Sequence, residues 1–172
     1  MKDILKFICE KILKQIEIAE SKFSITIALA TGVIIYATSF LSFQNTFSKI
    51  LSSACIALSL ISVIYSFLAL SVKQRNVKTK KIKNWEKENL LHYKSIIRFD
   101  ENTYLSVIQQ RYNFPNEYTP DFLDIDLAKQ IIGLAKSLNY KYMFFGLSLI
   151  FLICSVILGV ILALIFGVGG FF

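Results

Sequence analysis

Charged residues are absent from three long stretches of the chain. No Asp, Glu, Lys, Arg or His lies in residues 23–48, 50–72 or 142–172. Each stretch is longer than the ~20 residues that a helix needs to cross a bilayer core of ~30 Å. None shows the alternation of a barrel strand, and backbone groups in lipid must pair internally, so helices are expected. The pattern predicts three helical membrane spans, at residues 24–42, 51–72 and 143–166.

The first 22 residues repeat apolar side chains at helical spacing, which predicts an amphipathic helix leading into the first span. The apolar positions are Ile4, Leu5, Ile8, Ile12, Leu13, Ile16 and Ala19. Such a helix either lies on the lipid surface or packs on the second polar segment to form a small bundle. Because Glu residues are interspersed with the lysines, we favour packing in a bundle.

The polar segment between the second and third spans is predicted to be helical. Residues 84–98 are expected to form one helix, with Trp85, Leu90, Tyr93 and Ile97 facing inward. Asp100 is a predicted N-cap for a second helix, whose inner face carries Tyr104, Leu105, Ile108 and Tyr112. Thr119 and Pro120 form an expected cap and first position for the last helix, which nothing interrupts before Gly167. At 1.5 Å per residue, that helix is roughly 70 Å long.

These patterns predict an all-α membrane protein with three transmembrane helices, a small helical cytoplasmic region and a last helix continuous from cytoplasm into membrane. Its expected parts are a cytoplasmic amphipathic helix (1–22), a transmembrane hairpin (23–72), a cytoplasmic region (73–141) and a third span with an outside tail (142–172).

The basic residues predict the orientation of the spans. The chain is 55% hydrophobic yet has a net charge of +7, and 18 of its 19 Lys and Arg residues lie in residues 1–22 and 73–141. Lys and Arg collect on the cytoplasmic side, so both segments are expected inside and the turn at residues 44–49 outside. The charge is then a topology signal, and no nucleic-acid partner is expected. The basic run at residues 73–83 is interpreted as a membrane anchor in preference to an anion site.

Recognisable catalytic and metal-binding patterns are missing from the sequence. His92 is the only histidine, and Cys9, Cys55 and Cys154 are scattered, so neither a metal site nor a disulfide framework is expected. No phosphate-binding glycine loop lies on the cytoplasmic side. The acidic cluster of Asp121, Asp124 and Asp126 is explained by a helix dipole. We therefore expect no enzyme. Ser53, Ser59, Ser62 and Ser66 fall near helical spacing and predict a helix–helix contact face.

Several short motifs together resemble the membrane effectors of Pycsar, the pyrimidine cyclase system for antiphage resistance. Ala19-Glu-Ser-Lys22 opens the first span, where the family has an Asp-x-Lys motif usually preceded by Ala. Glu20 stands where Asp is more usual. Phe99-Asp100 and Tyr104-Leu105 follow, and Asp126-Leu-Ala-Lys-Gln-Ile131, Ala135-Lys136 and Tyr140-Lys-Tyr142 lead into the last span.

The resemblance implies an antiphage defence effector of the inner membrane. A partner cyclase activated by infection makes cyclic CMP or cyclic UMP, the cytoplasmic region binds it, and the spans rearrange or assemble as homo-oligomers to breach the membrane. The cell then stops growing or dies, an abortive infection. No cofactor is expected beyond this cyclic mononucleotide ligand.

A cyclic nucleotide offers one phosphate charge and a stackable base, so cations beside aromatic rings are the expected recognition chemistry. The candidate ligand-binding residues are Trp85, Tyr93, Lys94, Arg98, Arg111 and Tyr112, and Glu20 and Lys22 are expected to pair at the membrane boundary. Two alternatives remain. One is a pore effector triggered by a cyclic oligonucleotide or a partner protein, and the other is a non-toxic membrane scaffold that docks a cytoplasmic partner.

Overall fold

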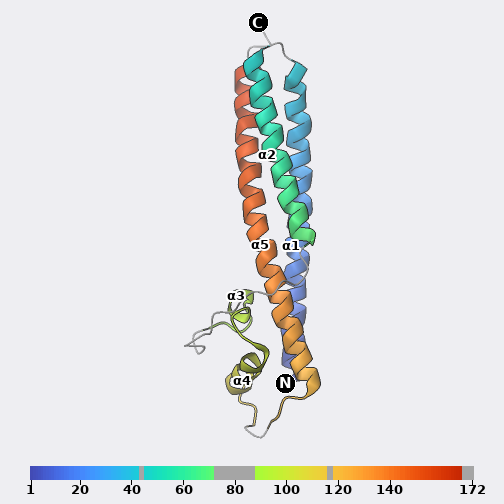
Figure 1. Cartoon of the computed structure of the whole chain (residues 1–172), viewed down its shortest axis with the longest axis vertical. Helices are drawn as coiled ribbons and strands as arrows, with labels where there is room; N and C mark the ends of the chain where they lie inside the picture. Colours follow the sequence, from blue (N-terminus) through green and yellow to red (C-terminus); the bar gives the residue numbers. More distant parts are fainter. Residues whose placement is uncertain (43–44, 72–87, 116–117, 168–172) are drawn as a thin grey trace. The chain divides into compact units, whose positions relative to one another are not determined.

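The computed structural model describes residues 1–42, 45–71, 88–115 and 118–167, and this part of the chain contains helices and no strand (Figure 1). The helices are α1 (Lys2–Ser39), a 3₁₀ turn (Phe40–Ser42), α2 (Thr46–Ser71), α3 (Tyr93–Ile96), α4 (Glu101–Arg111) and α5 (Phe122–Leu162), which ends in a π-helical turn (Ala163–Gly167). Helices α1, α2 and α5 are each long and apolar enough to cross a membrane. The predicted fold class and the long last helix are confirmed.

The chain divides into two compact units. The first contains Met1–Ala19 and Val72–Lys141, and we call it the extramembrane unit. The second contains Glu20–Ser71 and Tyr142–Phe172, and we call it the membrane unit, because all but one residue of the three uncharged stretches lie in it. Helices α1 and α5 each contribute residues to both units.

Buried positions of the membrane unit recur at alternating spacings of three and four residues. This spacing keeps one face of a helix toward its neighbours, as in left-handed coiled coils. The buried residues of α2 are Ser48, Ser52, Cys55, Ser59, Ser62, Ser66 and Ala69. The facing row of α5 is Ser148, Leu152, Ser155, Gly159 and Leu162. Nearly all of these side chains are small, so α2 and α5 can approach each other closely.

Aromatic contacts join α1 and α2 to α5. The rings of Phe23 (α1) and Phe145 (α5) meet edge to face with their centroids 5.5 Å apart. The rings of Tyr65 (α2) and Phe151 (α5) stack at 5.6 Å. Large apolar side chains elsewhere on these helices are exposed, for example Ile35, which is 64% exposed. Exposed apolar surface around a buried small-residue seam is what a helix bundle in lipid requires.

Helix α1 contributes its apolar face to the core of the extramembrane unit. Leu5, Ile8 and Ile12 are fully buried. The rest of this core comes from α3, α4, α5 and the residues between them: Ile96, Phe99, Tyr104, Leu105, Val107, Ile108, Ala128, Ile131, Ala135 and Leu138. The bundle interpretation of the N-terminal helix is confirmed. One position differs, because Leu13 lies off the buried face and is 40% exposed.

The predicted helix over residues 84–98 is wrong where the structure describes it. Residues 88–92 form turns, and α3 covers only Tyr93–Ile96. Local bonds compete with a helix here. The Leu91 N–H donates to the side-chain oxygen of Asn89 at 3.0 Å, and the Leu90 carbonyl accepts from the Tyr104 hydroxyl at 3.2 Å.

Two further positions differ from the sequence-based expectation, and one agrees. Helix α5 begins at Phe122, so its cap is Asp121 and the prediction of Thr119 is wrong. Ser53 is exposed, and Ser52 takes its place on the buried face of α2. The Asp100 cap is confirmed, since its side chain accepts from the Thr103 N–H.

Candidate functional site

A small polar cluster is formed by residues on and next to α3 in the extramembrane unit. The carboxylate of Glu88 accepts from the Ser95 hydroxyl at 2.6 Å through one oxygen and from the Arg98 guanidinium at 2.5 Å through the other. Ser95 is buried, the Glu88 side chain is 21% exposed and the Arg98 side chain is 51% exposed. The two donors therefore bind both oxygens of the Glu88 carboxylate at a partly exposed position.

The predicted ligand-binding residues lie on two elements of this unit. Tyr93 and Lys94 are on α3, and Arg98 follows it by two residues. Arg111 is the last residue of α4, and Tyr112 is its C-cap. Trp85 lies outside the described residues.

Tyr104 links α4 to the chain around α3. Its side chain is fully buried, and its hydroxyl donates to the Leu90 carbonyl, two residues after Glu88. Its ring lies 5.8 Å from the ring of Phe99. Burial raises the pKa of Tyr104, and the nearby Tyr112 phenol raises it further. Tyr112 itself, which the sequence placed on the inner face of this helix, is 41% exposed.

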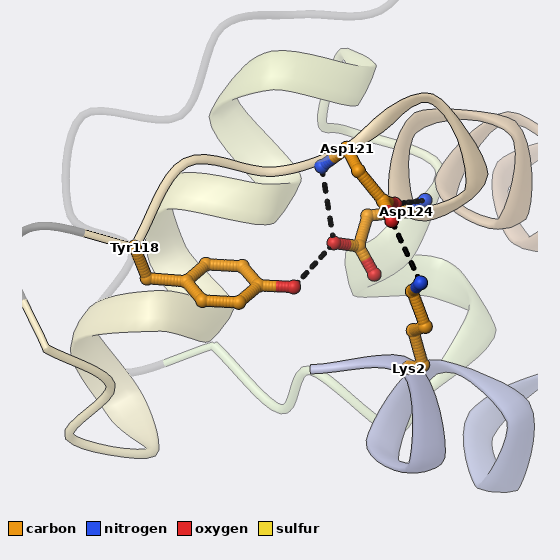
Figure 2. Close-up of polar contacts among 4 residues, drawn as sticks. All are labelled: Lys2, Tyr118, Asp121 and Asp124. Atoms are coloured by element: carbon orange, nitrogen blue, oxygen red, sulfur yellow. Dashed lines mark hydrogen bonds and ion pairs between the residues drawn. The ribbon is translucent and has the colours of Figure 1, made fainter.

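A second polar cluster organises the start of α5 (Figure 2). The Asp124 N–H donates to the Asp121 carboxylate at 2.9 Å, and the Asp121 N–H donates to the Asp124 carboxylate at 3.3 Å. This reciprocal cap satisfies two backbone donors. The Tyr118 hydroxyl points at the same Asp124 oxygen, 2.5 Å away, and the Lys2 ammonium lies 2.7 Å from Asp121. The cluster thereby joins the first residues of α1 to the first turn of α5.

Hydrogen bonds and charges within this second cluster shift the pKa values of its side chains. The Asp124 carboxylate accepts the Tyr118 hydrogen bond, which raises the pKa of Tyr118 to about 12. The Lys2 ammonium lowers the pKa of Asp121, and Asp121 in turn raises the pKa of Lys2. Asp124 is fully buried, and its second carboxylate oxygen has no hydrogen-bond partner among the described residues.

A cavity of about 300 Å³ lies beside α4. It is lined by Asn102, Leu105, Ser106, Gln109, Pro120 and Ile125. The Gln109 side chain in this lining donates to the carbonyls of Pro115 and Tyr118 at 3.1 and 3.2 Å. The lining has hydroxyl and amide groups and no cation, so it offers base-edge contacts but no partner for a phosphate charge.

The buried hydroxyls of the membrane unit form a hydrogen-bonded seam between α2 and α5, which we call the hydroxyl seam. Ser59 and Ser155 meet at 2.6 Å. Ser148 meets Ser62 at 2.9 Å and Ser66 at 2.8 Å. The Cys55 thiol lies 3.3 Å from the Ser155 hydroxyl.

Lys22 lies at the polar end of the first uncharged stretch. Its ammonium is 5.9 Å from the ring centroids of Tyr142 and Phe145, within the range of a cation–π contact. Residues two apart on a helix do not face each other. The pairing of Glu20 with Lys22 stays a prediction, while the aromatic neighbours of Lys22 are a finding of the structure.

Sequence reasoning missed Glu88, which accepts from the Arg98 guanidinium, and Ser95, which donates to the same carboxylate. Glu88 lies ten residues before Arg98 and seven before Ser95 without a continuous helix between them, so no spacing rule predicts these contacts. The cap at Asp121 and Asp124 had a signal, because acceptor side chains three residues apart before an apolar run are typical of a capping box. Among the residues that the structure describes, no group of His, Cys, Asp and Glu is arranged to hold a metal ion.

One sequence-family model covers nearly the whole chain. The chain matches the model of the Pycsar effector protein domain over residues 4–168. It belongs to the Pycsar effector family. This Pycsar effector is therefore an antiphage defence protein with several membrane-spanning helices, in a family whose signal is a cyclic nucleotide from a partner cyclase. The family is not a known catalytic one. No curated protein and no solved structure gives a significant match to this Pycsar effector.

Proposed function

We propose that this Pycsar effector binds cyclic CMP or cyclic UMP through its extramembrane unit and, in response, opens the inner membrane so that the infected cell stops growing. Family membership supports the signal, and the extramembrane unit supplies matching chemistry. Its half-exposed Arg98 guanidinium suits a phosphate charge. Tyr93 and Tyr112 supply rings on which a base can stack.

The hydroxyl seam is the observation that carries the membrane step. Besides allowing close packing, each serine places a hydroxyl in the interface, and α2 and α5 bury seven serines in the rows that face each other. Ser52 is buried with its hydroxyl unpartnered among the described residues. When α2 and α5 separate or rotate, these hydroxyls become a polar stripe that water can follow. Several copies, each exposing such a stripe, enclose the opening.

Orientation follows from the distribution of basic residues. The extramembrane unit faces the cytoplasm, where the cyclase product is made, and the turn before α2 faces outward. The signal and the sensing unit are then on the same side of the membrane.

Reconstitution tests the proposed function directly. Full-length protein in dye-filled liposomes is expected to release dye when cyclic CMP or cyclic UMP is added, and to hold the dye with cyclic AMP or cyclic GMP. Release without any nucleotide, or no release with either pyrimidine nucleotide at saturating binding, contradicts the membrane step. No calorimetric binding of either nucleotide contradicts the sensing step.

A disulfide lock tests whether the hydroxyl seam has to open. The hydroxyl oxygens of Ser62 and Ser148 are 2.9 Å apart, so Ser62→Cys with Ser148→Cys places two thiols within bonding reach. We expect the oxidised double variant to retain dye with the activating nucleotide and the reduced form to release it. Ser62→Cys alone is the matched control, since it carries one of the same changes without the lock. Equal release by the oxidised and reduced double variants contradicts opening at the seam.

A further inference from the structure

The cluster of Glu88, Ser95 and Arg98 has the features of an anion site that is already occupied by the chain itself. One carboxylate receives two donors, one on each oxygen, at 2.6 and 2.5 Å. The phosphodiester of a cyclic mononucleotide carries the same single negative charge, and it also has two non-bridging oxygens. A guanidinium and a hydroxyl that hold a carboxylate in this way are suited to such a phosphate.

We propose that Ser95 and Arg98 form the phosphate subsite of this effector and that Glu88 is an internal stand-in, displaced when the nucleotide phosphate binds. The subsite rests on the proposed function for its ligand. The subsite combines Arg98, which the sequence indicated, with Ser95 and Glu88, which it did not.

The exposure of the cluster makes the exchange feasible. The Arg98 side chain is 51% exposed, so a ligand can reach the guanidinium from solvent. Ion pairs with this exposure stabilise a fold only weakly, so breaking one does not unfold the unit. Ser95 is 8% exposed, so its buried hydroxyl needs a new acceptor once Glu88 leaves.

Calorimetry with full-length protein in lipid nanodiscs tests the subsite. Glu88→Gln removes the competing charge with almost no change in shape, so we expect cyclic CMP or cyclic UMP to bind about tenfold more tightly than to the wild type. Arg98→Ala is expected to weaken binding by about tenfold or more. A purely structural Glu88–Arg98 pair predicts no gain for Glu88→Gln, namely unchanged or weaker binding.

Asp126→Asn is the matched control. Asp126 forms an exposed ion pair with Lys129 at 3.9 Å in the same unit, so this variant removes the same charge and frees a cation elsewhere. We expect its nucleotide affinity to equal that of the wild type. A gain as large as that of Glu88→Gln assigns the effect to net charge and overturns the subsite.

Inorganic phosphate separates failure of the subsite from failure of the proposed function. The phosphorus NMR signal of inorganic phosphate is expected to broaden in the presence of the Glu88→Gln variant. The broadening is expected to be much weaker with the wild type or with Glu88→Gln combined with Arg98→Ala. If neither cyclic nucleotide binds the wild type but this pattern holds, the proposed ligand is wrong and the anion subsite stands. If a cyclic nucleotide binds and neither Glu88→Gln nor Arg98→Ala changes its affinity, the subsite is wrong and the function stands. If Arg98→Ala fails to fold, the sign of the Glu88→Gln effect decides alone.

Discussion

Ser148 is the most connected hydroxyl of the hydroxyl seam, and its removal gives a quantitative test of how α2 and α5 are held together. Its oxygen lies 2.9 Å from the Ser62 hydroxyl and 2.8 Å from the Ser66 hydroxyl, and it donates to the Ser62 carbonyl at 2.9 Å. Ser148→Ala removes all of these contacts and changes the volume of the side chain very little.

The expected cost follows from the number of contacts. Interhelical hydrogen bonds in membranes contribute about 0.6 kcal/mol on average. Losing two or three of them at Ser148 lowers the free energy of unfolding by about 1–2 kcal/mol, a change of roughly 5–30-fold in the unfolding equilibrium. The loss is larger than for a single pair because the hydroxyls of Ser62 and Ser66 both lose a partner in a dry interface.

Unfolding of the detergent-solubilised protein by increasing SDS, followed by circular dichroism, measures this cost. Ser53→Ala is the control, since Ser53 is an exposed serine next to Ser52 on α2, outside the buried row. We expect it to change the free energy of unfolding by less than about 0.5 kcal/mol. If Ser148→Ala unfolds at the same SDS fraction as Ser53→Ala, the seam does not hold the helices together, and the reasoning is refuted.

Three further outcomes follow from the start of α5 and from the topology. Asp124→Asn replaces the charged acceptor of the Tyr118 hydrogen bond with a neutral amide oxygen, so an ultraviolet titration should show the pKa of Tyr118 falling below about 12. In the wild type the bond to the carboxylate stabilises the neutral phenol. Its contribution to stability is complete below pH ~10 and is lost as the pH rises through about 12. An unchanged tyrosine titration contradicts the assignment. Lys2→Met removes the ammonium that lowers the pKa of Asp121, so this pKa should rise, as read from the NMR shift of the carboxyl carbon; a shift in the other direction refutes the pairing. In the wild type the lowered pKa means that the ion pair stabilises the fold above the unfolded pKa of 3.8. This effect is lost as the pH falls through the folded value. In whole cells, Asn45→Cys should react with a membrane-impermeant thiol reagent and Asn89→Cys should not, and the reverse result inverts the proposed topology.

The elements predicted correctly from sequence are those fixed by local or compositional physics. Uncharged stretches of more than 20 residues predict spans because a charge in lipid is costly whatever the tertiary packing. The cap at Asp100 was predictable because it depends on a backbone N–H only three residues away. The length of α5 was predictable because no proline or charge run interrupts it.

The elements that were missed depend on tertiary partners. The turns at residues 88–92 are held by the side chain of Asn89 and by the Tyr104 hydroxyl, and the second of these comes from another element. The choice between Ser52 and Ser53 depends on which one falls in the alternating three- and four-residue row, and a period of 3.6 drawn through a few serines does not separate them. The contact of Glu88 with Arg98 needs the turn between them, which spacing alone does not reveal.

The use of serine in the hydroxyl seam has a consequence for the biogenesis of the protein. Helix α2 leaves the ribosome and enters the bilayer before its partner α5 has been synthesised. During that interval a hydroxyl can bond to a carbonyl one turn back in its own helix, as Thr26 does to Lys22 at 2.8 Å in α1. A carboxylate at the same positions has no such local solution, because it cannot donate to a carbonyl and remains unsatisfied in lipid. Serine therefore lets α2 insert alone and exchange its internal bonds for those with α5 once that helix arrives.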